Sequence, residues 1–103
     1  MSEGLKYDTG KVPLELLPPE ALTEIAKVLA FGAEKYGRHN WRKGMAWSRL
    51  LGAILRHLFA WMQGEDKDPE SGLSHLAHAG CDILFLLTYE LNALGTDDRY
   101  KGN

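Results

Sequence analysis

The sequence predicts an all-α protein, a helical bundle of about three main helices per chain that is completed by oligomerisation. Apolar residues recur at helical spacing in three segments, and glycines and prolines separate these segments. No run of four or more residues alternates between apolar and polar side chains as a strand would. With 103 residues, 45% of them hydrophobic and 25% charged, the chain has the composition of one globular domain. We therefore expect a single domain over residues 1–103.

The first helix is expected to follow a polar arm, residues 1–17, and to begin near Pro19. Proline is favoured in the first turn of a helix and glycine directly after the last turn, so the helix should end around Tyr36 and Gly37. The apolar residues between these ends share one helical face: Leu22, Ile25, Ala26, Leu29 and Ala33.

The second helix is predicted over residues 49–63, with Ser48 as its N-cap and Gly64 as its end. A basic and aromatic loop, residues 37–47, precedes this helix, and an acidic turn, residues 65–72, follows it.

The third helix is predicted from about Leu73 to Leu94, and the polar tail, residues 95–103, is expected to fray. This helix is apolar on most of its sides, so it needs neighbours on most of its sides. Three helices can hardly supply them all, and we therefore expect a homodimer or a homotetramer.

Charge and hydropathy argue against several classes of protein. The formal net charge of −2 makes nucleic acid an unexpected partner. The sequence has no run of about 18 apolar residues and no secretory leader, so we expect no membrane span and a location in the cytoplasm. The single cysteine, Cys81, excludes an internal disulfide and is interpreted as a buried apolar residue.

Polar residues interrupt the second and third helices, and these residues are the candidates for chemistry. His75, His78 and Asp82 are spaced three and then four apart, which places them on one helical face. The second helix adds Arg56 and His57, and the acidic turn between the helices adds Asp68 and Glu70. Carboxylates suit Mg²⁺ or Mn²⁺, and imidazoles shift the preference toward Mn²⁺ or another transition ion. Such a cluster beside cations is what a metal-bound polyphosphate needs.

Each of these groups also has a structural interpretation. The two histidines of the third helix could cap the acidic turn or bridge to it, and the acids of that turn could favour the start of the helix through its dipole. Arg49 and Arg56 could be salt-bridge partners of Asp82, whose carboxylate precedes a long apolar run and would be costly to bury alone.

The loop that joins the first two helices has the composition of a nucleotide-binding segment. Lys35, with Arg56 and Lys11 from elsewhere in the chain, offers charge for phosphates, and Asn40 can read a base edge. Trp41 or Tyr36 offers a ring on which a purine could stack. Two alternatives stay open here, because Trp41 could anchor the loop to the core, and basic residues among aromatics also bind single-stranded nucleic acid.

Three blocks of the sequence, DTGKVPLELLPPEAL, FGAEKYGRHNWRKG and RHLFAWMQGEDKDPESGLSHLAHAGCDILFLL, resemble the phage and bacterial dATP/dGTP diphosphohydrolase family. This family is a MazG-like branch of the all-α nucleoside triphosphate pyrophosphohydrolases, and the resemblance extends from about Tyr7 to Leu94. It implies metal-dependent hydrolysis of purine deoxynucleoside triphosphates, dGTP above all and also dATP, to the monophosphate and pyrophosphate. It further implies that the dGMP formed supplies 2-aminoadenine nucleotide synthesis.

The wider superfamily holds magnesium with Glu-x-x-Glu on one helix and Glu-x-x-Asp on a later one. Asp82 matches the final Asp, but Ala79 stands three residues before it and the second helix has no Glu-x-x-Glu. We expect Glu34, His78 and Asp82 to contact the metal, with help from the acidic turn. The full expected set is Glu34, His57 and Asp82 for catalysis; Glu34, Asp68, Glu70, His75, His78 and Asp82 for Mg²⁺ or Mn²⁺; and Lys11, Lys35, Tyr36, Asn40, Trp41 and Arg56 for substrate.

Two other functions compete with hydrolysis. A small oligomeric nucleic-acid-binding or regulatory module would bind single strands in a salt-dependent way and without metal. A purely structural metal site would melt the fold when the metal is removed, whereas a catalytic metal would leave much of the fold standing. Two product pairs also stay open, monophosphate with pyrophosphate and diphosphate with phosphate.

Overall fold

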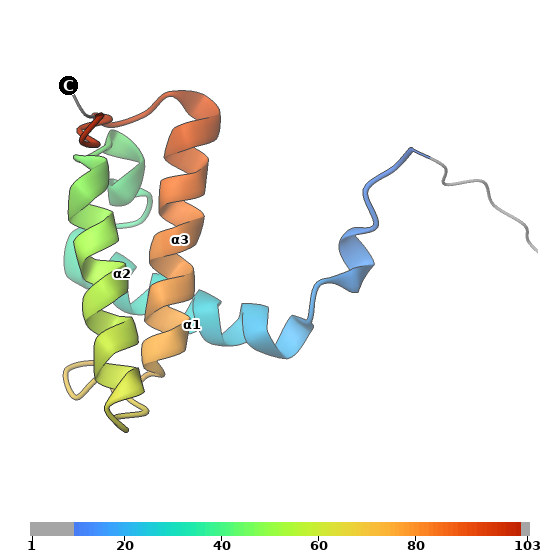
Figure 1. The fold of residues 1–103 in the computed structure, drawn as a ribbon. Coiled ribbons are helices and arrows are strands. Elements are labelled where there is room, and N and C mark those ends of the chain that lie inside the picture. The colour runs from blue at the N-terminus through green and yellow to red at the C-terminus, as the bar shows by residue number, and fades with distance from the viewer. Residues whose placement is uncertain (1–9, 102–103) are drawn as a thin grey trace, which may run out of the picture.

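The computed structural model describes residues 10–101, and within this range it contains helices and no strand (Figure 1). The helices, in chain order, are η1 (Leu14–Leu16), α1 (Pro19–Tyr36), η2 (Asn40–Lys43), α2 (Trp47–Met62) and α3 (His75–Asn92), where η marks a 3-10 helix. The prediction of an all-α chain with three main helices is therefore confirmed. No helix in the described range is long and apolar enough to cross a membrane.

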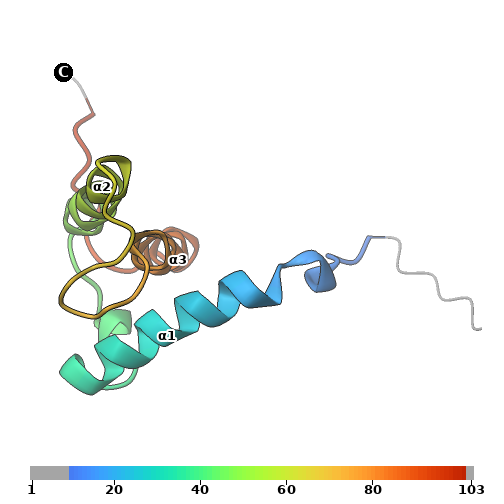
Figure 2. The same ribbon diagram turned by 90° about the horizontal axis from the view of Figure 1, so that it is seen from below.

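The helices α2 and α3 lie side by side and run in opposite directions, and α1 crosses α3 on the other side (Figures 1 and 2). The buried residues Val28, Ala77 and Cys81 join α1 to α3, with four partly buried neighbours: Ile25, Leu29, Leu73 and Phe85. A Cβ atom at Gly80 would lie 2.9 Å from the Ile25 side chain, so the glycine lets α1 approach α3 closely.

The ends of α1 agree with the prediction, whereas the other two main helices differ by a few residues. Ser48 is not the N-cap of α2, because the helix already begins at Trp47. Its first turn is capped by the tail, where the carboxylate of Asp98 accepts hydrogen bonds from the Ser48 amide, at 2.9 Å, and from the Ser48 hydroxyl. The N-cap of α3 is Ser74, whose hydroxyl oxygen accepts from the amides of Leu76 and Ala77.

The prediction that the tail frays is wrong for its described part, residues 95–101. The amide of Trp47 donates to the carbonyl of Thr96 at 2.9 Å, and the Trp47 indole N–H donates to the carbonyl of Leu94 at 2.8 Å. The amide of Thr96 donates in turn to the carbonyl of Met45. These hydrogen bonds hold the tail across the start of α2. Because about fifty residues of sequence separate the tail from its partners, no local pattern predicts the contact.

Gly95 allows the chain to turn from the end of α3 into the tail. We expect Gly95→Ala to lower the free energy of unfolding by about 2 kcal/mol or more, since a left-handed backbone alone costs 1–2 kcal/mol. Its φ is +73°, and a Cβ there would overlap the Met45 carbonyl. Urea unfolding followed by circular dichroism measures the loss. The matched control is Gly32→Ala inside α1, where a Cβ meets nothing within 4 Å and alanine is the better helix former. Equal stability of the two variants would contradict this account of the turn.

Candidate active site

A pocket of about 900 Å³ lies among α1, η2, α2 and α3. We call it the polar pocket. Nine of the predicted site residues line it: Lys35, Tyr36, Asn40, Trp41, His57, Asp68, Glu70, His78 and Asp82. The helical arrangement therefore brings the predicted basic loop and the predicted metal-ligand region to the two sides of one cavity.

A chain of hydrogen bonds leads from the acidic turn into this pocket. The carboxylate of Glu65 lies 2.7 Å from Nε2 of the buried His75, and Nδ1 of His75 lies 2.9 Å from Nδ1 of His57. With neutral rings, Nε2–H of His75 donates to Glu65 and Nδ1–H of His57 donates to His75, an assignment made from the network itself. Nε2 of His57 then keeps its lone pair and is available as a ligand or a base.

His78 extends the cluster on the other side of His57. The two imidazoles stack with centroids 4.6 Å apart and an angle of 12° between the rings. Nε2 of His78 lies 2.6 Å from the Ser71 hydroxyl, and Asp68 accepts hydrogen bonds from both the amide and the hydroxyl of Ser71 at 3.1 Å. Glu65, His75, His57, His78, Ser71 and Asp68 thus form one connected group, which we call the histidine network.

The electrostatics of the histidine network favour uncharged imidazoles and a charged carboxylate. Burial lowers the pKa of His57, and the neighbouring His78 and His75 lower it further. Burial likewise lowers the pKa of His78, against the opposing effect of Asp68. Burial acts to raise the pKa of Asp68, but the hydrogen bonds from Ser71 together with the neighbouring His78 and His57 outweigh it, and the pKa is lowered. Neutral imidazole and ionised carboxylate are the forms that bind a metal ion.

Asp82 lines the same pocket but has a different environment. Its carboxylate makes no hydrogen bond to any described residue, and burial raises its pKa to about 6, against the opposing charge of Arg56. A carboxylate whose pKa approaches neutrality and which faces a cavity is suited to accept a proton. The adjacent Cys81 is buried, and burial raises the pKa of its thiol to about 12, which agrees with its interpretation as an inert apolar residue.

The donor atoms that come closest together differ from the predicted ligand set. One ligand atom each from His57, Asp68 and His75 lie within 4.8 Å of one another, and among the described residues this is the group that could hold a metal ion. Ligand atoms around one ion bound at about 2.1 Å lie at most about 4.2 Å apart, so small side-chain adjustments bring these donors into range. The donor set therefore fits a divalent ion, and its two imidazoles favour Mn²⁺ or another transition ion.

Glu70, His78 and Asp82 lie outside this group but line the polar pocket, whereas the predicted ligand Glu34 lies outside both. Its side chain is exposed near the end of α1 and does not line the polar pocket. In a helix, Glu34 lies three residues beyond Phe31, and Phe31 is the residue that packs edge-on against His78. Periodicity could not decide which of these neighbouring positions faces the later helices.

Trp41 anchors the basic loop to α3, and this anchoring is the structural alternative to purine stacking. Its indole stacks on Phe85 with centroids 4.2 Å apart, and the Arg42 guanidinium lies over it at 4.4 Å. The hydroxyl of the buried Tyr89 also donates to the Trp41 carbonyl. Tyr36 is the more accessible ring, since 64% of its area is exposed, and the Lys35 ammonium lies 5.4 Å from the centre of the ring.

The cations around the polar pocket fall into two groups. Lys35 is paired with Glu70 at 2.8 Å, and the hydrogen bond to Glu70 raises its pKa. Arg38 and Arg49 also line the pocket, and their guanidiniums make no hydrogen bond or ion pair to any described residue. Arg56 does not line the pocket, and Lys11 is exposed on the arm.

Three residues outside the predicted set join the site: Glu65, Ser71 and Arg49. Ser71 has a local sequence signal, because a serine three residues after an aspartate forms a common Asx turn. Arg49 lies eight residues before His57, which is near two helical turns and keeps the two on neighbouring faces. Glu65 has no such signal, because its partner His75 belongs to the next helix.

Comparison with known proteins identifies the family. The family model described as "dATP/dGTP diphosphohydrolase, N-terminal" matches residues 1–99. A curated protein of Salmonella phage PMBT28, named dATP/dGTP diphosphohydrolase, is 44% identical over 96 residues, which cover 93% of this chain and 33% of that protein. The chain thus spans about a third of the length of this relative. No solved structure matches the chain. With three main helices in the described range and a family match over nearly its whole length, the chain belongs to the dATP/dGTP diphosphohydrolase N-terminal family.

Proposed function

We propose that this chain hydrolyses purine deoxynucleoside triphosphates, dGTP and dATP, to the monophosphate and pyrophosphate with Mn²⁺ or Mg²⁺. The observation that carries the proposal is one pocket lined by neutral imidazoles and carboxylates together with two guanidiniums, those of Arg38 and Arg49, that pair with no residue of the described range. The printed name of the phage relative supports the same substrates. In the proposed pathway, the dGMP formed supplies 2-aminoadenine nucleotide synthesis in the cytoplasm of the host.

The histidine network is the proposed metal site. His57, His75 and Asp68 would hold the ion, with Glu65 and Ser71 orienting these ligands through their hydrogen bonds. Because Nε2 of His75 donates to Glu65, its Nδ1 would exchange the hydrogen bond from His57 for the ion. When bound, the ion supplies Lewis acidity to the phosphate oxygens. Asp68 and Glu70 come from the same turn, so Glu70 can assist once phosphates compete for its partner Lys35.

Asp82 is the proposed general base. A water molecule attacks the α-phosphorus in line, its oxygen forms the new P–O bond, and the bond to the bridging oxygen of the pyrophosphate breaks. The proton of the water passes to the Asp82 carboxylate, which is mostly ionised at pH 7 because its pKa is about 6. Arg38, Arg49 and Lys35 neutralise the charge that accumulates on the leaving pyrophosphate.

The loop at the end of α1 is the proposed base site. Tyr36 offers an accessible ring for the purine, and Asn40 offers an amide that can bond to a base edge. Both residues line the polar pocket, as do the cations Lys35 and Arg38 of the same segment. The proposal therefore puts the purine near η2 and the phosphates between these cations and the histidine network.

The direct test incubates the purified chain with each deoxynucleoside and ribonucleoside triphosphate, in Mn²⁺, Mg²⁺ or chelator, and separates the products. Metal-dependent formation of dGMP or dAMP with pyrophosphate is expected. Chelator should stop turnover and leave the helical circular dichroism largely intact, because the core around Val28, Ala77 and Cys81 does not depend on metal ligands. No turnover with any nucleotide would overturn the proposal, and salt-dependent binding to single strands would then point to a nucleic-acid-binding module.

Removal of one guanidinium should weaken substrate binding. We expect Arg49→Ala to raise KM for the triphosphate by about ten- to a hundred-fold, because a hydrogen bond to a charged group is worth about 1.5–3 kcal/mol. Initial rates over a range of nucleotide concentrations give KM and kcat. Arg56→Ala is the matched comparison, since Arg56 lies on the same helix but outside the pocket lining. A larger effect from Arg56→Ala would indicate that Arg56, as predicted from the sequence, is the arginine that contacts the phosphates.

A further inference from the structure

Arg42 lies in η2 and lines the polar pocket, but the proposed hydrolysis assigns it no role. Two contacts hold its side chain in place. Its Nε–H donates to Nδ1 of His39 at 3.1 Å, and its guanidinium lies over the Trp41 indole, 4.4 Å from the ring centroid. Because Nδ1 of His39 accepts, a neutral His39 ring carries its proton on Nε2, a tautomer assigned from this contact.

The Trp41 ring that supports Arg42 is itself attached to α3. The indole stacks on Phe85 with centroids 4.2 Å apart and 12° between the rings, and the hydroxyl of the buried Tyr89 donates to the Trp41 carbonyl. The guanidinium of Arg42 therefore ends a stack that begins on a main helix. A side chain held in this way loses little rotamer freedom when a ligand binds to it.

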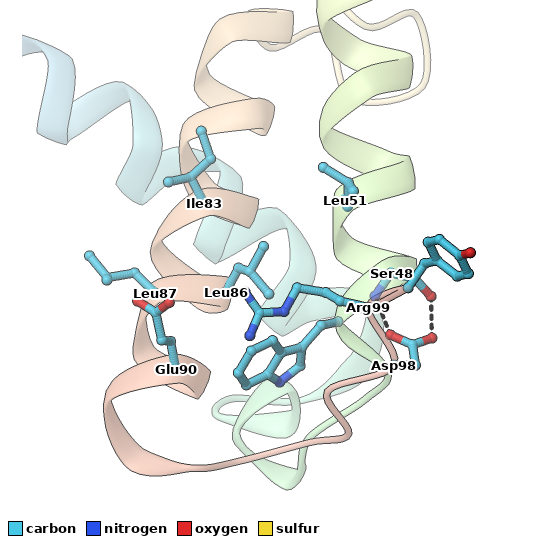
Figure 3. Close-up of a pocket in the computed structure, with 10 residues that line it drawn as sticks. Ser48, Leu51, Ile83, Leu86, Leu87, Glu90, Asp98 and Arg99 are labelled. Carbon is cyan, nitrogen blue, oxygen red and sulfur yellow. Dashed lines mark hydrogen bonds between the residues drawn. The ribbon is translucent and has the colours of Figure 1, made fainter. Parts of the chain in front are cut away.

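The two outer nitrogens of Arg42, Nη1 and Nη2, make no hydrogen bond to any described residue. Arg99 provides a contrast within the same chain. It lies at a second cavity of about 540 Å³, between α2, α3 and the tail (Figure 3), and its Nε and Nη2 donate to the Asp97 carboxylate, both at 2.8 Å. Arg42 has no such carboxylate among residues 10–101, so its outer N–H groups are available to a ligand of the polar pocket.

The position of Arg42 indicates that its ligand is the base and not the phosphates. Arg42 shares η2 with Asn40, a residue of the proposed base site, whereas the histidine network belongs to α2, α3 and the acidic turn. Phosphate charge can be neutralised by any nearby cation, but a base edge requires hydrogen-bond donors of fixed orientation. A guanidinium held by His39 and Trp41 before the ligand arrives meets that requirement.

Guanine and adenine differ at the edge that a guanidinium binds. Guanine presents two neighbouring acceptors, N7 and O6, and these accept two N–H groups of one arginine side chain. Adenine presents the N7 acceptor beside the N6 amino group, whose hydrogens would face the N–H groups of the arginine. Two donors that face each other leave both without an acceptor, which is unfavourable in a pocket. The Arg42 guanidinium therefore fits guanine better than adenine.

We propose that Arg42 sets the base preference of the polar pocket by donating two hydrogen bonds to N7 and O6 of guanine, so that dGTP is preferred to dATP. His39 and Trp41 are positioning residues for this guanidinium, because they hold it without contacting the base through it. The inference rests on the proposed function, since it takes the ligand of the pocket to be a purine deoxynucleoside triphosphate. Its test therefore measures binding separately from hydrolysis.

The test uses the α,β-imido analogues of dGTP and dATP, which resist cleavage between the α- and β-phosphates, and measures their binding to the full chain by titration calorimetry in Mn²⁺. The dGTP analogue should bind about five- to a hundred-fold more tightly, the range of one such paired contact. Arg42→Ala should remove most of this ratio. Arg42→Gln should shift it toward dATP, because a side-chain amide matches N6 and N7 of adenine. Lys43→Ala is the matched control, since Lys43 is the next cation of η2 but does not line the pocket, and it should keep the ratio.

Two modified nucleotides test the same contact in the unchanged protein, so the test does not depend on the folding of a variant. The compound dITP keeps N7 and O6 and lacks only the 2-amino group, so it should keep the advantage over dATP. The compound 7-deaza-dGTP has a C–H group in place of N7, so it should lose most of that advantage. Competition of each compound against the bound dGTP analogue measures both affinities.

A ratio that Arg42→Ala leaves unchanged would overturn the inference. Equal weakening of both analogues in Arg42→Ala would also overturn it, because Arg42 would then contact the phosphates. Either result would leave the proposed hydrolysis standing if the products still form. A chain that hydrolyses no nucleotide but prefers the dGTP analogue through Arg42 would support the inference and contradict the hydrolysis. Absence of binding by both analogues would overturn the inference outright.

Discussion

Replacement of Asp82 by asparagine is expected to lower kcat by about a hundred- to ten-thousand-fold, which is the usual contribution of a general base. The substitution keeps the size and most of the polarity of the side chain but removes the atom that accepts the proton. Initial rates at saturating dGTP and metal measure the effect. Asp66→Asn is the matched control, since Asp66 is an exposed acid of the same protein that does not line the polar pocket.

The same substitution should make the metal-free protein more stable at pH 7, by about 1–2 kcal/mol. The pKa of Asp82 is raised from 3.8 to about 6 by burial, so the folded protein binds the proton more tightly than the unfolded chain does. The free energy of unfolding contributed by this group therefore falls as the pH rises from about 4 to about 6, and the ionised form carries a penalty at pH 7. Asparagine has no such penalty.

The two effects together separate catalysis from structure. If Asp82 and Arg56 formed a structural salt bridge, Asp82→Asn would destabilise the fold, because a charge would lose its partner. Loss of activity with a gain in stability would identify a group kept for function at the expense of stability. Urea unfolding in chelator at pH 5 and pH 7 checks the sign, because the gain should shrink toward the lower pH. A variant that is active, or less stable at pH 7, would remove Asp82 from the proposed role.

The fold was predictable because its main signals are local. Proline at the start of α1, glycine after its end, and apolar spacing within it are all read within one segment, and each agrees with the structure. The tail was not predictable in this way. Its contacts join Asp98 to Ser48 and Thr96 to Trp47, and a polar sequence gives no sign that a helix fifty residues earlier needs a cap.

The site was predictable in its residue types but not in its pairings. Spacing predicts that His75, His78 and Asp82 share one side of α3, yet their surroundings differ: His75 lies inside a hydrogen-bonded chain, and the Asp82 carboxylate makes no hydrogen bond to a described residue. The contact between His57 and His75 depends on the register between α2 and α3, and this register cannot be read from one sequence. For the same reason, the sequence could not show that Glu34 does not line the pocket.

The histidine network makes the second large prediction: His57→Ala should weaken Mn²⁺ binding and lower turnover by about a hundred-fold or more. His57 offers a donor atom to the proposed metal group and stacks on His78, so its removal takes away a ligand and opens the network. Titration calorimetry with Mn²⁺ measures the affinity independently of activity. His39→Asn is the control, because His39 lines the pocket but lies outside the proposed metal group, and its φ of +62° is a conformation that asparagine tolerates.

Glu65 should have a smaller effect than His57, because it acts on the proposed metal group only through its hydrogen bond to His75. Glu65→Gln keeps a hydrogen-bond acceptor near Nε2 of His75 but removes the charge, so it should weaken Mn²⁺ binding by about ten- to a hundred-fold, the range for residues that orient ligands. The expected order of loss is therefore His57→Ala, then Glu65→Gln, then the His39→Asn control. An unchanged Mn²⁺ affinity in His57→Ala would show that the metal binds elsewhere, and the three histidines would then be a structural cluster that joins α2 to α3. The order of the three Mn²⁺ affinities therefore tests whether His57 binds the ion directly and Glu65 acts on it through His75. No single substitution can make this distinction.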